Sequence, residues 1–264
     1  MKKACKTAIF SILTLSLSVP FVSGIFSNLR VDSYKAHAEE ASAYDYTKCN
    51  VNIPTGYYSS LDLNDTKENF KNKLSSIISN NAVKFSYSYV GDTILNISDM
   101  DPEHPDNIKC FYTNQSLTGG WNREHIWCKS HGFTNQTNDS PYTDAHHLRA
   151  TNATANSTRN NSDYGEVDHN TSYQDIFGNY YTGDTYEPRD EIKGDCARMI
   201  FYMAIRYKND AKYQAELING SSMSYLVDGG KMIFGNLPTL LKWHYQDPVS
   251  VEELYRNNVV YSFQ

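Results

Sequence analysis

Several segments of the chain place apolar residues at helical spacing. Between positions 70 and 78 these residues follow an Asp-x-x-Glu capping box that starts at Asp65, which predicts a helix over 66–79. A longer, mostly apolar stretch from Glu191 to Tyr207 predicts a buried helix. Two shorter helices are expected at 238–245 and 250–257, the second behind a Ser-x-x-Glu capping box.

The middle of the chain has strand and turn signals instead. Residues 108–113 are rich in β-forming side chains, and a Thr-Gly-Gly turn leads from them into an expected strand at 121–127. A polar loop at 134–140 separates this strand from a short return strand at 146–149. These segments predict a small antiparallel β element within a mainly helical protein, so the expected fold class is α+β.

Residues 152–161 contain four asparagines, which is a poor composition for a helix. Nevertheless, Asn152, Asn156 and Arg159 would share one face of a helix, because they are spaced by four and three residues. A local rule broken in this way is expected at functional positions. We therefore expect a helix here that follows the two strands and carries functional side chains.

The N-terminal segment has the pattern of a secretory signal over residues 1–38. Lysines precede an apolar run from Ala8 to about Val22, and Ala36-His37-Ala38 fits a cleavage site. The run is short for a membrane span, which makes an uncleaved anchor the less favoured alternative. We expect an exported protein without a membrane-spanning segment, in which a flexible arm over 39–54 precedes a single domain over 55–264.

Charge limits how such a protein can bind a polyanion. Removing residues 1–38 takes five bases and one acid from the totals of 24 and 30, which leaves 19 and 29 and a net charge of −10. Coating of nucleic acid by bulk electrostatics requires many Lys and Arg contacts to phosphate, so the net charge counts against this mode of binding. An enzyme that needs one cationic cleft and a divalent ion is compatible with the charge.

The cysteines leave two alternatives open. Four remain after cleavage and permit two disulfides in three pairings, but their spacing contains no Cys-x-x-Cys pair that would suggest a structural zinc site. Buried free thiols and one disulfide are equally compatible with the sequence. The residues concerned are Cys49, Cys110, Cys128 and Cys196.

Two blocks hold residue types suited to cleaving a phosphodiester. Residues 121–127 read Trp-Asn-Arg-Glu-His-Ile-Trp, and residues 143–161 begin Thr-Asp-Ala-His-His-Leu-Arg and continue into the asparagine-rich segment. Together they supply a carboxylate for a hard cation, histidines that accept a proton near neutral pH, and arginines that match phosphate. Glu124 and His125 are neighbours, so their side chains leave opposite faces of a regular strand unless it ends or twists there.

The order and spacing of these blocks resemble the secreted bacterial endonuclease I family, nucleases of the His-Me finger (ββα-metal) class. The similar motifs are Asn-Arg-Glu-His-x-Trp, Thr-Asp-x-His-His-Leu and x-x-Asn-x-x-Arg-x-Asn, with further similarity over 177–207 and 240–258. The resemblance extends from about Tyr89 to the last residue. Cys128 departs from the pattern, because it stands where the family usually has proline.

The resemblance implies a metal centre. Glu124 and Asn156 would hold Mg²⁺, with Mn²⁺ or Ca²⁺ as alternatives, and His125 would activate the attacking water. The expected product carries a 5′ phosphate. One carboxylate and one amide leave most coordination positions to water and substrate, as is usual for magnesium.

Further residues are expected to contact or support the site. Arg149 and Arg159 are expected at the reacting phosphate, and Arg198 and Asn161 are expected to bind the substrate, although an internal ion pair with Asp195 is the rival interpretation for Arg198.

Asp144, His146 and His147 are expected to support the site structurally. The adjacent histidines face opposite ways on a strand, so at most one points at the site, and one is expected to tie the return strand to the helix with Asp144 as its partner.

The expected function is therefore a secreted, monomeric and largely sequence-non-specific endonuclease that acts on DNA, with RNA as an open alternative. A zinc-dependent hydrolase that uses His125, His146 and His147 is the rival enzyme, but the chain lacks the His-Glu-x-x-His helical pair. An exported binding module, suggested by the tyrosine and asparagine content, is the non-enzymatic alternative.

Overall fold

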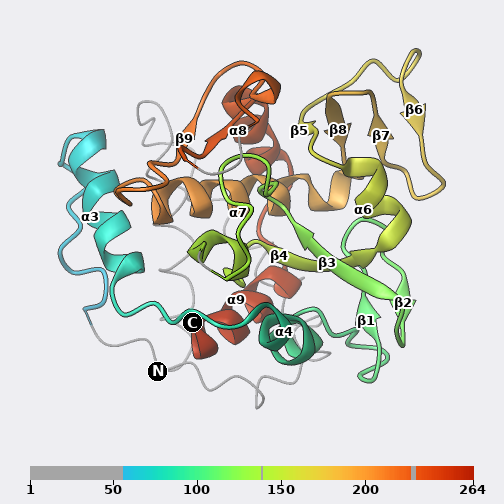
Figure 1. Cartoon of the computed structure of the whole chain (residues 1–264), viewed down its shortest axis with the longest axis horizontal. Helices are drawn as coiled ribbons and strands as arrows, with labels where there is room; N and C mark the ends of the chain where they lie inside the picture. Colours follow the sequence, from blue (N-terminus) through green and yellow to red (C-terminus); the bar gives the residue numbers. More distant parts are fainter. Residues whose placement is uncertain (1–55, 138, 227–229) are drawn as a thin grey trace, which may run out of the picture.

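The computed structural model describes residues 56–137, 139–226 and 230–264 (Figure 1). These residues form helices and four small sheets, which agrees with the expected α+β class. The proposed signal over 1–38, the arm over 39–54 and Cys49 lie outside the described residues. No described helix has the length and apolar character needed to cross a membrane.

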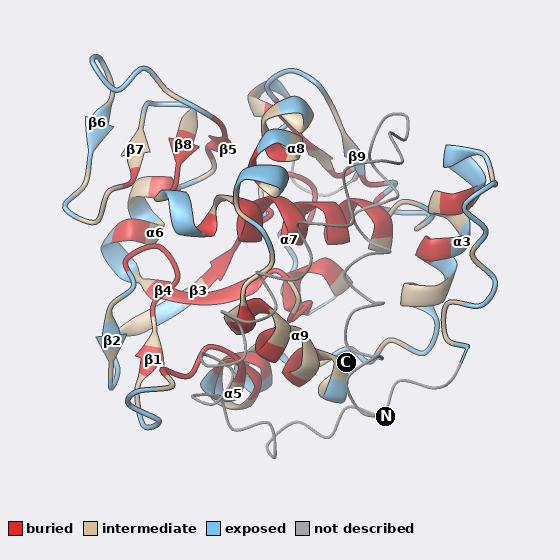
Figure 2. Cartoon of the chain, turned by 180° about the vertical axis from the view of Figure 1, so that it is seen from behind, coloured by how far each residue is buried: buried red, intermediate tan, exposed pale blue. Residues whose placement is uncertain are grey.

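Helix α7 (Lys193–Arg206) runs through the centre of the protein. Every residue from Gly194 to Ile205 is buried, and Figure 2 shows the helix buried along its length. A helix that is covered on all sides belongs to the core. It packs against α3 (Lys67–Ser79) and α8 (Leu237–Gln246), so the helix predicted over 191–207 is confirmed as a core element.

Capping boxes were predicted at the start of two helices, and the structure confirms one of them. The Ser250–Glu253 capping box at the start of α9 (Val251–Phe263) is present as predicted. In α3 the N-cap is Thr66 rather than Asp65, because the Thr66 hydroxyl accepts from the Asn69 amide at 3.2 Å. Helix α9 also continues six residues past the predicted end, since the buried residues Val259 and Val260 extend its packed face.

A winding helical segment precedes the strands and was not predicted. It consists of α4 (Tyr87–Tyr89), the π-helical turn η3 (Val90–Leu95) and α5 (Asn96–Ser98). Buried side chains of η3 pack against Ala145, Leu148 and Val260. The segment therefore joins the end of α9 to the strand that carries Leu148.

Two antiparallel strands followed by a helix form the expected strand–strand–helix arrangement (Figure 1). Strand β3 (Trp121–His125) pairs with β4 (Leu148–Asn152), and α6 (Ala153–Arg159) follows directly. The prediction placed the end of β3 two residues too late and the start of β4 two residues too early. Asn152 is the N-cap of α6, with its side chain accepting from the amides of Thr154 and Ala155, and does not lie on the helix face.

Small sheets surround this unit. Of the strand expected over 108–113, only β1 (Ile108–Lys109) forms, paired with β2 (Ser116–Leu117). A four-stranded sheet beside α6 was not predicted (Figure 1). Its strands, in spatial order, are β5 (Asp163–Tyr164), β8 (Thr185–Glu187), β7 (Tyr180–Tyr181) and β6 (Tyr173–Gln174). A separate parallel pair, β9 (Glu216–Leu217) and β10 (Ile233–Phe234), contributes Phe234 to the core.

Three cysteines lie in the core as free thiols. Cys110, Cys128 and Cys196 are buried and unpaired, so the open alternative is decided for these residues in favour of free thiols. Burial raises the pKa of Cys110 and of Cys128 to about 12. Cys128 fits the core at the family's proline position, with its sulfur 3.8 Å from the Asn160 carbonyl.

Candidate active site

Arg159 fastens the end of α6 to the end of β3. Its guanidinium donates to the Ile126 carbonyl at 2.6 Å and to the His125 carbonyl at 3.2 Å, and it lies over the Tyr164 ring at 4.7 Å. The side chain is 1% exposed. Arg159 therefore fixes where β3 ends, directly after the Glu124–His125 pair.

Glu124 is held in a buried polar network. Its carboxylate accepts from the Tyr112 hydroxyl at 2.7 Å and lies 3.4 Å from the Arg159 guanidinium. The Tyr112 hydroxyl is in turn 2.5 Å from that of Tyr164. Burial raises the pKa of Glu124, and the charge of Arg159 and the Tyr112 hydrogen bond offset only part of that effect.

His125 packs among aromatic rings on the other side of β3. Its ring contacts Tyr87, Phe133 and Tyr142, with the edge of Tyr142 at a centroid distance of 4.7 Å. The Nε2 atom lies 2.8 Å from the Tyr142 carbonyl, which can only accept a hydrogen bond. The neutral ring therefore carries its proton on Nε2 and presents Nδ1 as the acceptor. Burial lowers the pKa of His125 well below its usual value, so the ring is neutral at physiological pH.

The two neighbouring side chains leave β3 on opposite sides, as a regular strand requires. Glu124 contacts Tyr112 and Arg159, whereas His125 contacts the Tyr87–Tyr142 pair. They share cationic surroundings nonetheless, because Lys129 and Arg159 act on the pKa of both. The strand ends at His125, directly after Glu124.

Asn156 lies half-buried on α6 with its amide orientation fixed. Its Nδ2 group donates to Asn122 Oδ1 at 2.9 Å and to the Arg123 carbonyl at 3.4 Å. Both contacts belong to β3, so the amide nitrogen faces the strand. Within the described part of the chain, no hydrogen bond is made by its Oδ1, which is the atom that a hard cation would use.

The donor set suits a magnesium-like ion. Glu124 offers a carboxylate on the side of β3 that faces α6, and Asn156 offers a free amide oxygen from α6. Among the described residues, no group of three or more His, Cys, Asp or Glu side chains is arranged to hold a metal ion. A cation at these two residues would therefore leave most of its coordination to water and substrate, as magnesium does, whereas the three histidines of the zinc alternative do not form a site.

Arg149 stands opposite Glu124 on β4, but its guanidinium is bound to other carboxylates. It is 1% exposed and pairs with Asp99 and Glu252, each at 3.1 Å, while its guanidinium lies over the Phe111 ring. The structure thus commits Arg149 to carboxylates that join β4 to α9. Its guanidinium is therefore neutralised in the core, although Arg149 is the cross-strand partner of Glu124.

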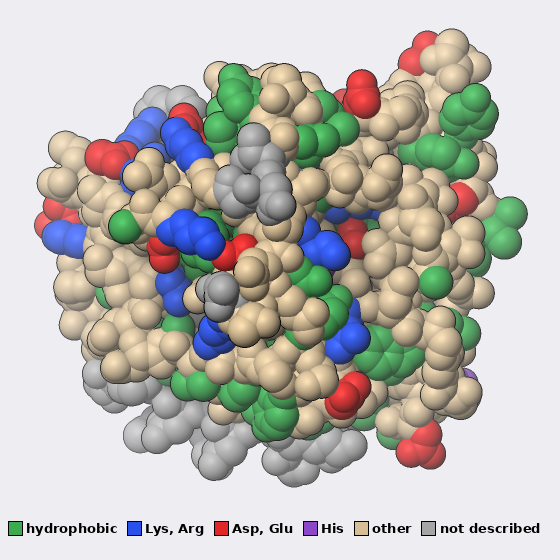
Figure 3. All heavy atoms as spheres, viewed as in Figure 1, with side chains coloured by type: hydrophobic (Ala, Val, Ile, Leu, Met, Phe, Trp, Pro, Cys, Tyr) green, Lys and Arg blue, Asp and Glu red, His purple; other side chains and the backbone are tan. Residues whose placement is uncertain are grey.

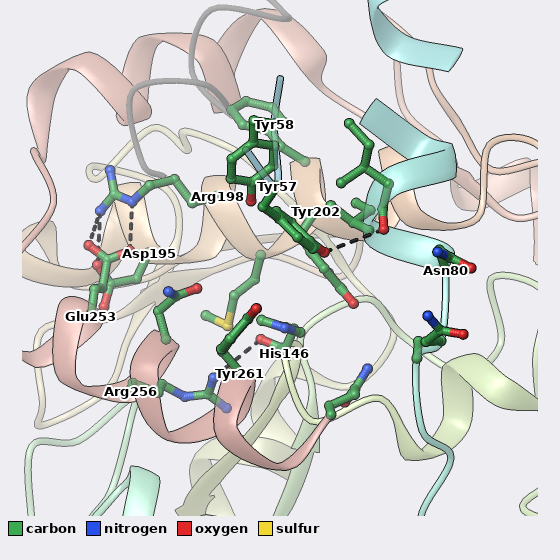
Figure 4. Close-up of a pocket in the computed structure, with 18 of the residues that line it drawn as sticks. Tyr57, Tyr58, Asn80, His146, Asp195, Arg198, Tyr202, Glu253, Arg256 and Tyr261 are labelled. Carbon is green, nitrogen blue, oxygen red and sulfur yellow. Dashed lines mark hydrogen bonds and ion pairs between the residues drawn. The ribbon is translucent and has the colours of Figure 1, made fainter. Parts of the chain in front are cut away.

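Arg198 lies in a second region, on the wall of a cavity of about 600 Å³ between α3, α7 and α9. It contacts both carboxylate oxygens of Glu253, at 2.6 and 2.5 Å, and one of Asp195 at 3.0 Å (Figure 4). The ion pair with Asp195 weighed in the sequence is therefore present. His146 faces the same cavity, with its ring on Tyr202 at a centroid distance of 4.1 Å.

His147 and Asp144 support the loop before β4 but not as a pair of side chains. The His147 ring bonds to the Pro141 carbonyl at 2.7 Å and accepts from the Trp127 amide at 3.4 Å. Asp144 instead accepts from the hydroxyls of Tyr202 and Tyr207 on the central helix and at its end. The contact between Asp144 and the histidine pair that the sequence suggested runs through the backbone, because Asp144 Oδ1 accepts from the His146 amide at 3.0 Å.

The sequence did not single out three neighbours of the site. Tyr142 supplies the carbonyl that orients His125, and Tyr112 holds Glu124; neither role follows from a motif, because one uses the backbone and the other a distant segment. Lys129 is exposed, and its Nζ lies 3.5 Å from the Tyr142 hydroxyl. Asn161, predicted to bind substrate, is half-buried, and its backbone carbonyl lies 3.2 Å from His131 Nε2.

Comparison with known proteins gives this geometry its context. Residues 54–264 match the family described as Endonuclease I. The chain belongs to this family. Members are generally dependent on a divalent metal ion, which agrees with the oxygen donors at Glu124 and Asn156.

Curated relatives agree with the family. The chain is 42% identical over 204 residues to an extracellular ribonuclease of Bacillus subtilis (strain 168), covering 74% of this chain and 68% of the relative. It is also 42% identical over 199 residues to an extracellular ribonuclease of Bacillus amyloliquefaciens, covering 72% of this chain and 66% of that relative. The resemblance seen in the sequence is thus confirmed, and the chemical class is that of an endonuclease, a hydrolase acting on nucleic acid.

Proposed function

We propose that this chain is a secreted, divalent-metal-dependent endonuclease of the His-Me finger type that hydrolyses RNA and DNA and leaves 5′ phosphates. The observation that carries the proposal is the oriented His125. Its Nε2 proton is held by the Tyr142 carbonyl, and burial keeps the ring neutral, so Nδ1 is ready to accept a proton.

His125 acts as the general base in this mechanism. Nδ1 takes a proton from the attacking water, and the Tyr142 carbonyl stabilises the imidazolium that forms, because it already accepts from Nε2. Burial between Tyr87 and Phe133 prevents rotation of the ring. Proton acceptance at a fixed atom is the contribution of this side of β3.

Glu124 and Asn156 would hold the cation. When bound, a divalent ion supplies charge for the phosphate and the leaving oxygen. Glu124 is held in place by Tyr112 and Arg159, and Asn156 is turned so that its oxygen faces away from β3. Arg159 serves mainly to position Glu124 and the end of β3, since it is buried and bonded to two carbonyls.

The remaining arginines of the sequence interpretation receive structural roles. Arg149 and Arg198 neutralise buried carboxylates, so we assign them to stability and not to the phosphate. Asn161 stays a predicted substrate contact. The protein is expected to act as a monomer.

The substrate follows from chemistry and from the relatives' names. Attack by an activated water needs no 2′-hydroxyl, so both DNA and RNA are substrates of this mechanism. The two relatives are named extracellular ribonucleases, which supports RNA as a substrate and supports export of this chain. The apolar N-terminal run in the sequence supports export independently.

The test uses the chain that begins at Glu39, with supercoiled plasmid and single-stranded RNA offered separately. Cleavage of both is expected in magnesium, with loss of activity in excess chelator and recovery when magnesium or manganese is returned. The ends should be 5′ phosphates with free 3′ hydroxyls.

Attack by the 2′-hydroxyl of RNA is the competing mechanism, and the same assay separates it. That reaction cleaves RNA alone and yields a 2′,3′-cyclic phosphate without needing a metal ion. Cyclic ends, or undiminished cleavage in chelator, would overturn the metal assignment and the role of Glu124.

A further inference from the structure

Most basic side chains of this protein are already paired with carboxylates. Within the described ranges, five have no carboxylate within 4.0 Å, and they are Lys67, Lys84, Arg123, Lys129 and Arg206. Two of these five, Arg123 and Lys129, flank the Glu124–His125 pair in sequence. The arginines that the motifs suggested as phosphate contacts all belong to the paired set.

Arg123 is held beside the aromatic cluster of the site. Its guanidinium lies over the Tyr87 ring at 3.9 Å and donates to the Tyr87 carbonyl at 2.9 Å. Gly91 makes room for it, because a Cβ atom there would lie 2.8 Å from the guanidinium nitrogen. The Arg123 side chain is half-buried and oriented, while its charge is not neutralised by any described carboxylate.

Lys129 approaches the same cluster from the other end. Its ammonium lies 5.3 Å from the centre of the Tyr142 ring and 3.5 Å from the Tyr142 hydroxyl. Tyr87 and Tyr142 touch edge to face at 5.1 Å, and both contact His125. The two cations therefore lie on either side of one aromatic cluster that contains the general base.

The net charge of the protein is negative, so binding of a nucleic acid depends on local cations such as these two. Figure 3 shows only isolated basic side chains on the face that carries β3 and α6, with acidic ones around them, and no continuous basic field. A polyanion cannot be held there by bulk charge. Local cations without a carboxylate partner are the groups able to exchange water and counterions for phosphate.

We propose that Arg123 and Lys129 bind the backbone phosphates on the two sides of the bond that is cleaved. This inference rests on the proposed function and identifies the ligand as a nucleic-acid strand with a phosphate on each side of the reacting one. Arg123 provides a planar, oriented donor, whereas Lys129 provides a mobile point charge. Both contacts position the strand and neither takes part in proton transfer.

The test compares Lys129→Gln with Lys67→Gln, a matched control. Lys67 is also exposed and also lacks a carboxylate within 4.0 Å, but it begins α3, far along the chain from the site. With a polymeric substrate at low salt, Lys129→Gln should lower kcat/KM roughly tenfold, while Lys67→Gln should match the wild type. The slope of log(kcat/KM) against log[KCl] should become shallower by about 1 for Lys129→Gln alone.

A second substrate separates strand binding from disturbance of the active site. Bis(4-nitrophenyl) phosphate is a diester without flanking phosphates, so its hydrolysis should fall much less than cleavage of the polymer in Lys129→Gln. Lys129→Arg should retain most activity on the polymer, because the charge is kept. Arg123→Gln should behave like Lys129→Gln, and the exposed Lys129 keeps the test decisive if the Arg123 variant folds poorly.

Several outcomes would overturn the proposal. These are normal polymer cleavage by Lys129→Gln, an equal loss on both substrates with an unaltered salt slope, or an equal loss in Lys67→Gln. Failure of the proposed function itself is distinguishable, because the wild-type chain would then cleave neither the polymer nor the small diester in magnesium.

Discussion

Two regions of this protein use the same charged residue types in opposite ways. In the core, Arg149 of β4, Arg198 of α7 and Arg256 of α9 are all buried, and each lies against one or more carboxylates. At the edge formed by β3 and α6, Arg123 and Lys129 have no carboxylate partner within reach among the described residues. The core arginines are neutralised by buried carboxylates, whereas Arg123 and Lys129 are available to bind an anion.

The difference teaches that residue type and motif do not assign a role to a cation. Arg149 follows a conspicuous histidine pair and Arg198 lies on a helix similar to the family's, yet both neutralise buried acids. Removing one partner of a buried ion pair leaves the other charge buried and unpaired, which strongly lowers the free energy of unfolding. Removing an exposed cation changes that free energy little. Variants in the two regions should therefore affect different measurements.

The largest expected effect is at His125, the proposed general base. His125→Ala removes the proton acceptor, so turnover should fall roughly 10²–10⁴-fold, and added magnesium should restore nothing. Single-turnover cleavage over a magnesium titration measures this, with circular dichroism to confirm folding. Recovery by metal alone would mean that the roles of His125 and Glu124 are reversed.

In the helical core, Arg198→Ala should instead destabilise the fold. It leaves Glu253 and Asp195 buried without their cation, which should cost about 3–5 kcal/mol in the free energy of unfolding. Urea denaturation measures the loss, and cleavage per folded molecule should stay near that of the wild type. A fall in turnover at unchanged stability would return Arg198 to the substrate-binding residues.

A smaller effect is expected from Asn156, the proposed amide ligand of the metal ion. Asn156→Ala should raise the magnesium concentration needed for half-maximal activity by roughly tenfold or more, because the free Oδ1 is lost. Asn152→Ala is the matched control from the same helix. It removes the N-cap of α6 and should cost about 1 kcal/mol of stability with no change in magnesium dependence. Equal shifts in both variants would contradict the assignment of Asn156.

The smallest effect concerns acid stability and His147. Its Nδ1 accepts from the Trp127 amide and its Nε2 donates to the Pro141 carbonyl, so both nitrogens are satisfied only in the neutral ring. Burial lowers its pKa to about 4. Below the unfolded value of about 6.5 the unfolded chain binds a proton that the folded chain does not, so stability falls with pH between roughly 6.5 and 4.

Above that window His147 contributes no pH dependence. His147→Gln should therefore flatten the curve of unfolding free energy against pH by about 1.4 kcal/mol per pH unit within the window. Urea midpoints at pH 7, 6 and 5 test this. An unchanged slope in His147→Gln would show that the proton is taken up elsewhere.

Periodic elements of the fold were predictable from the sequence, and irregular ones were not. Apolar spacing or capping residues within each segment predict a helix without reference to the rest of the chain. This holds for α3, α7, α8 and α9, and all four are present. The β5–β8 sheet consists of two- and three-residue strands, too short to show alternation. Its pairing depends on contacts such as Asp163 with Thr185, which are distant in sequence.

The same limit applies to the site. Glu124, His125 and Asn156 were singled out because they occupy recognisable motifs, and the structure places them around the end of β3. Which cation is free could not be predicted, because pairing is decided by segments far away in the chain. Arg149 meets Glu252 across 103 residues, for example, and Arg198 meets Glu253 across 55.

The buried thiols make the folded protein resistant to thiol chemistry. Cys110, Cys128 and Cys196 have raised pKa values and no access to solvent, so almost none of their thiolate forms while the chain is folded. Oxidants and alkylating reagents should therefore leave the folded enzyme untouched and react as soon as it opens. In a Cys49→Ser background, the rate of thiol labelling would report directly how often this protein unfolds.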